Sequence, residues 1–294
     1  MKVLISGNEG FVGTHLMREL REHGYNVEGH DFPDGDLRLP GVFAAHLESF
    51  KPDLVIHLAA QVGRLFGEDD LTHTIASNST MTALVAYACG QSGVPILYSS
   101  TSEVYGDQGN ALCTEDGPLK LSHNAYGVSK GHGEDWLRLY APDGLKIVRL
   151  SMPAGPGAPP GRGRRALDNF LWQAHHRMPI TVHKGAERSW CHAADTVAGI
   201  RMVIEKGAPG AYNVGRDDVP LSMHALARKC CVLAGAPFDL IDVVEAPTAQ
   251  TVVKRLSTQK LRDLGWEPTR ELDEILADTY AWVKHFDRDG VHAP

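Results

Sequence analysis

The stretch Lys2-Val-Leu-Ile-Ser-Gly7-Asn-Glu-Gly-Phe-Val-Gly13 decides the fold of this chain. Its first five residues form a short apolar run that predicts a strand, and the segment from Phe11 to His23 has the pattern of a helix. A strand, a glycine turn and a helix in this order are the setting of a dinucleotide-binding fingerprint, because glycines permit the tight turn and let a pyrophosphate reach the helix N-terminus. The spacing is GxxGxxG rather than the general GxGxxG. We therefore expect a dinucleotide site that includes Gly7, Gly10, Phe11, Val12 and Gly13.

An acidic residue after the second predicted strand indicates which dinucleotide is bound. The strand from Tyr25 to Gly29 leads into His30 and Asp31, and Asp31 comes 24 residues after the first glycine, about where the adenosine ribose should lie. Its carboxylate would repel the 2′-phosphate of NADP, and Arg38 is the only arginine nearby. We therefore expect NAD as the cofactor.

Strand and helix patterns alternate along the first half of the chain, which predicts an α/β fold with a Rossmann-like, doubly wound parallel sheet. The expected strands are Lys2 to Ser6, Tyr25 to Gly29, Leu54 to Leu58, Pro95 to Ser99 and Leu145 to Leu150, with helices at Phe11 to His23, Leu71 to Gln91 and Asn124 to Tyr140. After the third of these strands, the small residues Ala59 and Ala60 would let the backbone approach a dinucleotide.

A proline- and glycine-rich segment, Pro153 to Gly161, cannot continue a helix or strand and indicates a boundary. We expect an NAD-binding domain over residues 1–152 and a smaller α/β substrate-binding region over 153–294. In the second region, helices are expected at Ala166 to Arg177, Ala193 to Lys206, Leu221 to Ala234, Thr258 to Leu264 and Leu272 to Phe286, and short strands at Ile180 to Val182, Ala211 to Val214 and Leu240 to Val244.

Tyr126-Gly-Val-Ser-Lys130, with the hydroxyl run Ser99 to Ser102 upstream, carries the chemistry. Four residues apart on a helix, the phenol and the ammonium lie on one face. A cation beside a phenol favours its ionised form, so Tyr126 can act as general base toward an alcohol. An alcohol that loses its proton in this way is poised to transfer a hydride to NAD.

The composition excludes several classes of function. A net charge of -7 and a pI near 6.1 argue against nucleic-acid binding. The five cysteines form no CxxC, and the 15 histidines show no metal-ligand spacing, so we expect reduced thiols and no metal. No apolar stretch has the length of a membrane span, so we expect no membrane association and a cytoplasmic protein.

Several motifs occur in a familiar order along nearly the whole chain. They are the GxxGxxG turn, His57-Leu-Ala-Ala60, Tyr98-Ser-Ser-Thr-Ser-Glu-Val-Tyr-Gly106, Tyr126-Gly-Val-Ser-Lys130, Arg188-Ser-Trp-Cys-His192 with Asp195, Tyr212-Asn-Val-Gly215 and Leu264-Gly-Trp266. The chain thereby resembles the extended short-chain dehydrogenases, specifically the nucleotide-sugar epimerase, dehydratase and decarboxylase branch.

The resemblance implies a role for each matching residue. Tyr126 would take the proton of the sugar 4-hydroxyl, Thr101 would hydrogen-bond the same hydroxyl, and Lys130 would hold the nicotinamide ribose and lower the tyrosine pKa. The hydride would pass from C4 to NAD and leave a 4-keto sugar. The expected NAD site also includes Asp36, Leu37, Leu58, Ala59, Ala60 and Ser99.

The fate of that ketone depends on Glu103. It stands where the 4,6-dehydratases carry the base that removes the C5 proton, and where the UDP-glucuronate decarboxylases carry an active-site glutamate. Ser102 replaces the aspartate that protonates the leaving hydroxyl in dTDP-glucose 4,6-dehydratases. We expect elimination of water or of carbon dioxide. A 4-epimerase is the alternative, and a non-catalytic NAD-binding regulator is a third hypothesis.

The resemblance also implies a site for the nucleotide-diphosphate sugar and a partner. Arg188, and Lys254 or Arg255, would bind the substrate together with Ser102. Met152 replaces an asparagine that contacts the nucleotide sugar in relatives. Relatives commonly form homodimers through the helices that correspond here to Asn124 to Tyr140 and Leu71 to Gln91.

Overall fold

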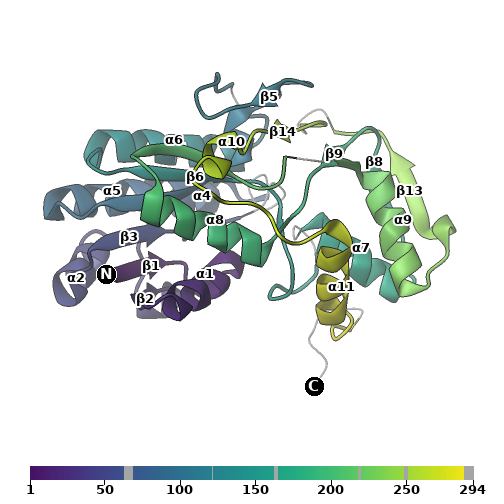
Figure 1. Cartoon of the computed structure of the whole chain (residues 1–294), viewed down its shortest axis with the longest axis horizontal. Coiled ribbons are helices and arrows are strands. Elements are labelled where there is room, and N and C mark those ends of the chain that lie inside the picture. Colours follow the sequence, from purple (N-terminus) through teal and green to yellow (C-terminus); the bar gives the residue numbers. More distant parts are fainter. Residues whose placement is uncertain (63–68, 121, 162–164, 218–219, 248–250, 288–294) are drawn as a thin grey trace.

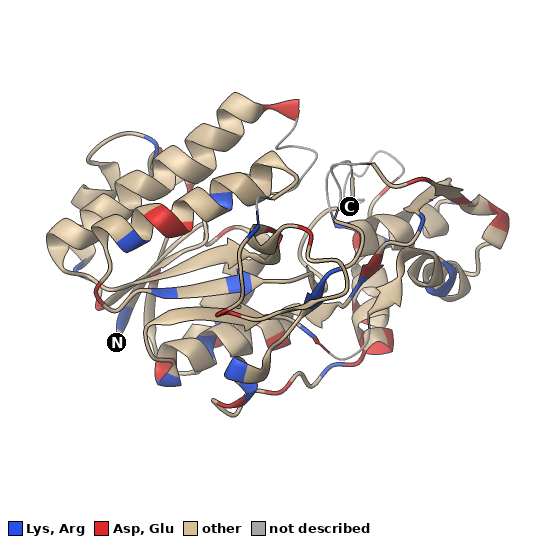
Figure 2. Cartoon of the chain, turned by 90° about the horizontal axis from the view of Figure 1, so that it is seen from above, with Lys and Arg blue, Asp and Glu red and all other residues tan. Residues whose placement is uncertain are grey.

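The computed structural model describes residues 1–62, 69–120, 122–161, 165–217, 220–247 and 251–287. A large unit built around a central sheet lies beside a smaller unit built around helices α7 (Ala166–His175), α9 (Met223–Ala234) and α11 (Leu272–Val283) (Figure 1). None of the described helices is long and apolar enough to cross a membrane. In Figure 2, basic and acidic residues are interspersed over both units rather than gathered on one face.

Six parallel strands form the central sheet, in the order β11-β6-β4-β3-β1-β2. Their bounds are β1 (Lys2–Ser6), β2 (Asn26–His30), β3 (Leu54–His57), β4 (Ile96–Thr101), β6 (Lys146–Leu150) and β11 (Gly210–Val214). The expected strands are confirmed to within two residues at each end. β1 pairs with β2 on one side and with β3 on the other, so the direction of winding reverses at β1, and the loops at the carboxyl ends of these strands lie beside this switch point.

Helices cover both faces of the sheet. On one face, α1 (Phe11–Glu22) and α8 (Ala193–Lys206) bury Leu16, Leu20 and Ile200 against the strands. On the other face lie α2 (Val42–Phe50), which was not predicted, α5 (Met81–Ser92) and α6 (Ala125–Tyr140). The expected helix over 71–91 is helical throughout, but it begins as α4 (Leu71–Thr74) and passes through the π-helical turn η2 (Ile75–Thr80) before α5.

The central sheet takes in residues beyond the expected boundary at residue 152. β11 comes from residues 210–214 and pairs with β6, and α8 covers the sheet beside α1. Without β11, the backbone groups along this edge of β6 would lack their partners, so the large unit must include a segment from the second half of the chain. Trp266, still later in the chain, is buried in the same core.

The smaller unit has its own core. α7, α9 and α11 pack around Leu167, Phe170, Leu226 and Ile275. β8 (Ile180–His183) pairs in parallel with β13 (Ile241–Val244). The short helix η4 (Phe238–Leu240) directly precedes β13. The predicted helix at 221–234 begins two residues late, because Leu221–Ser222 form strand β12, paired with β9 (Glu187–Arg188).

Two further pairs of short strands join the units. β7 (Pro153–Ala154) pairs with β10 (Cys191–His192), and β14 (Arg255–Leu256) pairs with β5 (Leu112–Cys113). The short helix α10 (Gln259–Arg262) follows β14 in the chain. Through the second pair, residues 251–256 reach the large unit beside the 3-10 turn η3 (Ser102–Tyr105), which follows β4. The remaining 3-10 turn, η1 (Phe32–Asp34), follows β2.

Candidate active site

The glycine turn between β1 and α1 has the geometry of an anion cradle. Gly7 has φ +77° and donates its N–H to the His30 carbonyl at 2.9 Å. A Cβ at Gly13 would lie 2.1 Å from the Gly7 oxygen, so α1 can start this close to β1 only with glycine there. Gly10 is the N-cap of α1 and provides no side-chain hydrogen bond, which leaves the first-turn N–H groups open to a phosphate. The turn fits the pyrophosphate of NAD.

The turn is held in place by contacts of its residues Phe11 and Val12. The Arg165 guanidinium of the smaller unit lies 3.5 Å from the centroid of the Phe11 ring. Val12 packs against the core beneath the sheet. The expected turn residues therefore lie together, next to the smaller unit.

Asp31 follows β2 and lies against the glycine turn. Its carboxylate accepts hydrogen bonds from the N–H groups of Glu9, in the glycine turn, at 3.0 Å and of Phe32 at 2.9 Å. Asp36 is paired with Arg38, with Nη2 to Oδ2 at 2.7 Å, and this hydrogen bonding lowers the pKa of Asp36 to about 2. Leu37, also expected at the cofactor, has its side chain in the core with Phe43.

The segment after β3 passes close to the turn. The N–H groups of Leu58 and Ala59 both donate to the Ser6 carbonyl at 3.0 Å, and a Cβ on Gly7 would come within 2.6 Å of the Ala59 nitrogen. Ala60 is half-buried beside them, and Ser99 is buried in β4. These contacts hold the backbone of the segment after β3 against the glycine turn.

Tyr126 and Thr101 meet above the carboxyl end of β4. Asn124 caps α6 by accepting the Gly127 N–H at 2.9 Å, which sets Tyr126 in the first turn of the helix. Burial raises the pKa of Tyr126 to about 12, the hydrogen bond with the Thr101 hydroxyl opposes this shift, and the Glu103 carboxylate adds to it. Lys130 is not among the groups that shift the pKa of Tyr126, so the expected lowering of the phenol pKa by Lys130 is absent from this structure, and burial is the largest effect.

Lys130 lies one turn further along α6, fully buried. Its Nζ is 4.3 Å from the centroid of the Tyr98 ring. Burial lowers the pKa of Lys130 to about 7, against the effect of Glu134, which favours the charged form. Burial therefore brings the pKa of the Lys130 ammonium close to neutral pH.

Glu103 is held by three groups. Its backbone N–H donates to the Thr101 hydroxyl oxygen at 3.3 Å, its Oε2 accepts from Asn124 Nδ2 at 3.0 Å, and its Oε1 forms an ion pair with Lys254 Nζ. Burial opposes ionisation of this carboxyl, but Lys254 and Asn124, with Arg188 nearby, outweigh it and hold the pKa of Glu103 below its ordinary value. Glu103 is therefore a carboxylate at neutral pH, close enough to Tyr126 to affect the phenol.

The basic residues expected to bind substrate lie in three different settings. Arg188 donates to the carbonyls of Thr251 at 2.6 Å and Val252 at 2.8 Å and so holds the segment that precedes Lys254. Lys254 points to Glu103, and Arg255 is exposed on β14. Lys254 and Arg255 also line a cavity of about 230 Å³ together with Asn110, Ser189 and Asp217. Of the upstream arginines Arg162, Arg164 and Arg165, the first two lie outside the described residues.

Met152 and Ser102 complete the expected set. Met152 has φ +47°, a left-handed conformation that asparagine tolerates better than methionine, and its carbonyl accepts the Cys191 N–H at 3.2 Å. Ser102 is buried at the start of η3.

Asn78 is a residue of the site that the sequence analysis missed. It lies in the π-helical turn, where its Oδ1 accepts the Gln61 N–H at 2.7 Å and its Nδ2 donates to the Gln61 carbonyl and to the Ser129 hydroxyl, both at 3.0 Å. It thus joins the segment after β3 to the helix that carries Tyr126. A buried asparagine in an apolar helical pattern was the available signal.

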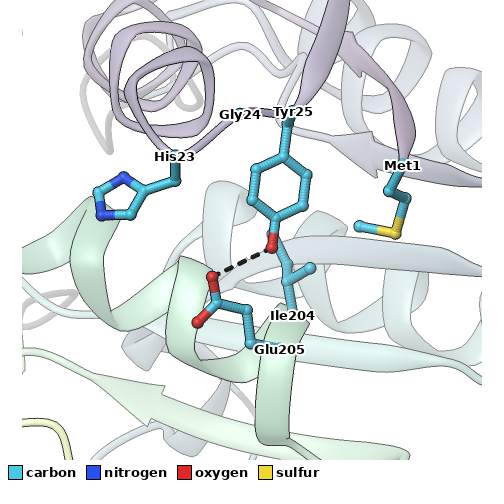
Figure 3. A pocket seen from close by; sticks show the side chains of 6 residues that line it. All are labelled: Met1, His23, Gly24, Tyr25, Ile204 and Glu205. Atoms are coloured by element: carbon cyan, nitrogen blue, oxygen red, sulfur yellow. Dashed lines mark hydrogen bonds between the residues drawn. The ribbon is translucent and has the colours of Figure 1, made fainter.

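A hollow of about 410 Å³ lies far from these residues and is lined by Met1, His23, Gly24, Tyr25, Ile204 and Glu205 (Figure 3). It is lined by the turn that precedes β2 and by the end of α8, at the amino ends of the strands, where Tyr25 donates to Glu205 at 3.1 Å. The residues described above gather at the opposite, carboxyl ends, where ligands bind in sheets of this type.

Comparison with known proteins identifies the family. A sequence model of the NAD dependent epimerase/dehydratase family matches residues 3–215. The chain belongs to this family. An NAD-dependent enzyme of the epimerase, dehydratase and decarboxylase group, as the motifs predicted, is thereby confirmed.

Relatives in the epimerase/dehydratase family cover nearly the whole chain. A dTDP-glucose 4,6-dehydratase of Streptomyces griseus is 30% identical over 96% of this chain and 94% of its own. The UDP-glucuronic acid decarboxylase 5 of Arabidopsis thaliana is 26% identical over 94% of this chain and 87% of its own. Among solved structures, a UDP-glucose 4-epimerase of Thermus thermophilus, in complex with NAD, has a TM-score of 0.85 at 23% identity, covering 96% of this chain and 98% of that one. The last likeness confirms the Rossmann-like fold.

Proposed function

We propose that this enzyme oxidises C4 of the hexose in a nucleoside diphosphate sugar and then eliminates water across C5 and C6, as a 4,6-dehydratase. The observation that supports it is the placement of Glu103: an ionised carboxylate beside Tyr126, tied to Asn124 and Lys254. A 4-keto group acidifies the C5 proton, and an ionised carboxylate next to the C4 base is the group needed to remove it.

Each residue of the site has a part in this reaction. Tyr126 removes the proton of the 4-hydroxyl. Thr101, which is hydrogen-bonded to the Tyr126 phenol, orients the same 4-hydroxyl. NAD, held by the glycine turn and Asp31, would accept the hydride from C4. Lys130, buried beside Tyr98, would hold the nicotinamide ribose. The substrate contacts of Met152, Arg188 and Arg255 stay predictions.

Decarboxylation of a uronate is the second candidate, because the Lys254 ammonium could pair with a substrate carboxylate at C6. Loss of carbon dioxide from a 4-keto uronate needs no base at C5, however. Epimerisation at C4 removes no proton from C5 and so would not use Glu103 as a base. The ionised carboxylate therefore favours elimination of water.

A substrate panel tests the proposal. The purified enzyme is given UDP-glucose, dTDP-glucose, GDP-mannose, UDP-GlcNAc and UDP-glucuronate, and products are identified by NMR and mass spectrometry. We expect a 4-keto-6-deoxy sugar from one of the hexoses, abolished by Tyr126→Phe and reduced about 100-fold or more by Glu103→Gln. A pentose product, or a C4-inverted sugar made equally well by Glu103→Gln, would contradict the proposal. A biological effect that survives Tyr126→Phe would favour a regulator.

We also propose that the protein is a homodimer formed through α5 and α6. Tyr87 on α5 and Leu139 on α6 are 52% and 63% exposed, and Tyr87 packs edge-to-face on Tyr140, which stacks on Trp136. This apolar surface on adjacent helices suits a second copy of the chain. Light scattering should give twice the chain mass, and Leu139→Glu should give a monomer; a wild-type monomer would contradict the proposal.

A cytoplasmic location is supported by the thiols. All five cysteines are buried and none of them forms a disulfide, as expected in a reducing compartment. Cell fractionation tests this location.

A further inference from the structure

Elimination of water from C5 and C6 needs an acid as well as a base. Hydroxide is a poor leaving group, so the C6 oxygen must gain a proton as the C–O bond breaks. Ser102 stands where dTDP-glucose 4,6-dehydratases carry an aspartate for this purpose, and a serine hydroxyl is far too weak an acid to replace it. The proton can come from Glu103 itself, after it has taken the C5 proton, or from another residue beside it.

Lys254 is in the right place. Its side chain is 4% exposed, and its Nζ contacts Glu103 Oε1, so the ammonium and the carboxylate are one hydrogen bond apart. The two side chains are 151 positions apart in sequence and are brought together by the segment that crosses from the smaller unit. That segment is fixed on both sides of Lys254, by Arg188 bound to the preceding carbonyls and by the pairing of β14 with β5.

We propose that Lys254 is the acid that protonates the departing C6 oxygen, in concert with Glu103 as the base at C5. The inference rests on the proposed dehydratase function. In this step the C5–H bond breaks and its proton goes to Glu103, a double bond forms between C5 and C6, the C6–O bond breaks, and the oxygen leaves as water with the proton from Lys254. The step is redox-neutral, and Lys254 regains its proton from solvent afterwards.

The geometry and the charge balance support this pairing. The departing proton and the departing oxygen lie on adjacent carbons, so their acceptor and donor must also be neighbours, as Glu103 and Lys254 are. The transfer converts an ion pair into a neutral acid and a neutral amine, so no net charge arises in a buried site. Burial lowers the pKa of Lys254, although Glu103 opposes this, and proton release from the ammonium is thereby eased.

Two substitutions separate proton donation from simple positioning of Glu103. Lys254→Met removes the charge and the proton. Lys254→Arg keeps a cation beside Glu103 but gives up its proton far less readily. If Lys254 is the acid, both variants should lose about 100-fold or more in formation of the 6-deoxy product while still oxidising C4, which is detected by the near-ultraviolet absorbance of the reduced cofactor. Restoration of the elimination rate by Lys254→Arg would show a positioning role and overturn the inference.

A substrate with a different leaving group gives the decisive result. Fluoride leaves without protonation, so the 6-deoxy-6-fluoro form of the accepted sugar nucleotide should be turned over by Lys254→Met within about tenfold of the wild-type rate. Glu103→Gln should not be rescued, because its defect lies at C5. If Lys254→Met lowers the elimination rate equally on both substrates, the inference is overturned.

Controls keep the two proposals distinguishable. Lys184→Met removes a lysine whose ion pair with Glu245 is on the surface of the smaller unit, and it should leave both rates unchanged. If wild type converts no hexose nucleotide to a 6-deoxy product, the proposed function fails. If wild type eliminates water and Lys254→Met does so equally well, the function stands and the role of Lys254 is refuted.

Discussion

Arg149 and Glu134 form a two-contact ion pair inside the molecule, with Nη2 to Oε2 at 2.8 Å and Nε to Oε1 at 3.0 Å. Arg149 lies on β6, and Glu134 lies on α6 one turn after Lys130. The same carboxylate accepts the Ser100 hydroxyl at 2.6 Å, and the guanidinium donates to the Tyr105 hydroxyl at 3.0 Å. The pair therefore fixes the helix that carries Tyr126 to the strands beneath it.

Loss of the Glu134 carboxylate should destabilise the whole protein. Glu134→Gln leaves the Arg149 guanidinium buried without its counter-charge, so we expect the free energy of unfolding to fall by about 3–5 kcal/mol. Denaturant titration followed by circular dichroism measures this change. The matched control is Glu245→Gln, which removes an exposed partner of Lys184 and should cost less than about 1 kcal/mol. Equal effects of the two substitutions would contradict the prediction.

Gly13→Ala should weaken NAD binding. The added methyl would lie 2.1 Å from the Gly7 oxygen, so α1 must move away from the turn and its N-terminus from the pyrophosphate. We expect at least a tenfold rise in Kd, about 1.4 kcal/mol, by calorimetric titration with NAD. Gly131→Ala is the control, because the atom nearest to its Cβ is 4.0 Å away and alanine favours the helix. Unchanged NAD affinity in Gly13→Ala would refute this account of the turn.

The left-handed backbone at Met152 should reverse the usual order of hydrophobic substitutions. A β-branched residue is strained at φ +47°, whereas asparagine accepts it, so Met152→Asn should be about 1 kcal/mol more stable than Met152→Val. Met178 packs against the same core without a positive φ, so Met178→Val should be more stable than Met178→Asn. Thermal unfolding of the four variants checks both orders. The same order at both positions would argue against strain at Met152.

Asp168 should make stability depend on pH. It is fully buried with its Oδ2 2.5 Å from Arg165 Nε, and burial raises its pKa to about 6, against the effect of Arg165. Because the native state holds this proton more tightly than the unfolded state, the free energy of unfolding should fall as pH rises from about 4 to about 6. This contribution is on the order of 2–3 kcal/mol.

Asp168→Asn isolates that contribution, since the amide does not titrate. The stability of the variant relative to wild type should rise across the same pH range, measured by urea denaturation at several pH values. A difference that is constant with pH would show that Asp168 does not titrate there.

The sequence predicted those parts of the fold that depend on local pattern. The five strands from β1 to β6 that enter the sheet, and the helices around Tyr126 and Leu16, follow from apolar periodicity and glycine position. β11 was expected as a strand, but its place beside β6 depends on long-range pairing that no local pattern encodes. The two-residue strands β5 and β14 are likewise too short to leave a periodic signal.

The site shows the same division. Glycine spacing and Asp31 could be recognised because short motifs carry their geometry. The contact between Glu103 and Lys254 joins distant segments, and the pKa of Tyr126 depends on how deeply the phenol is buried. Residue spacing predicts neither this contact nor this pKa. The spacing of Tyr126 and Lys130 predicted a shared helix face but not the Tyr98 ring beneath the ammonium.

The late arrival of β11 matters while the protein is being made. On the ribosome, the outer edge of β6 stays without a neighbour until residue 214 has emerged from the exit tunnel. An uncovered strand edge invites pairing with other nascent chains, and many ribosomes on one message bring such chains close together. Productive synthesis therefore calls for a chaperone on the nascent chain during that interval, and messages truncated before this point should yield aggregated rather than partly active protein.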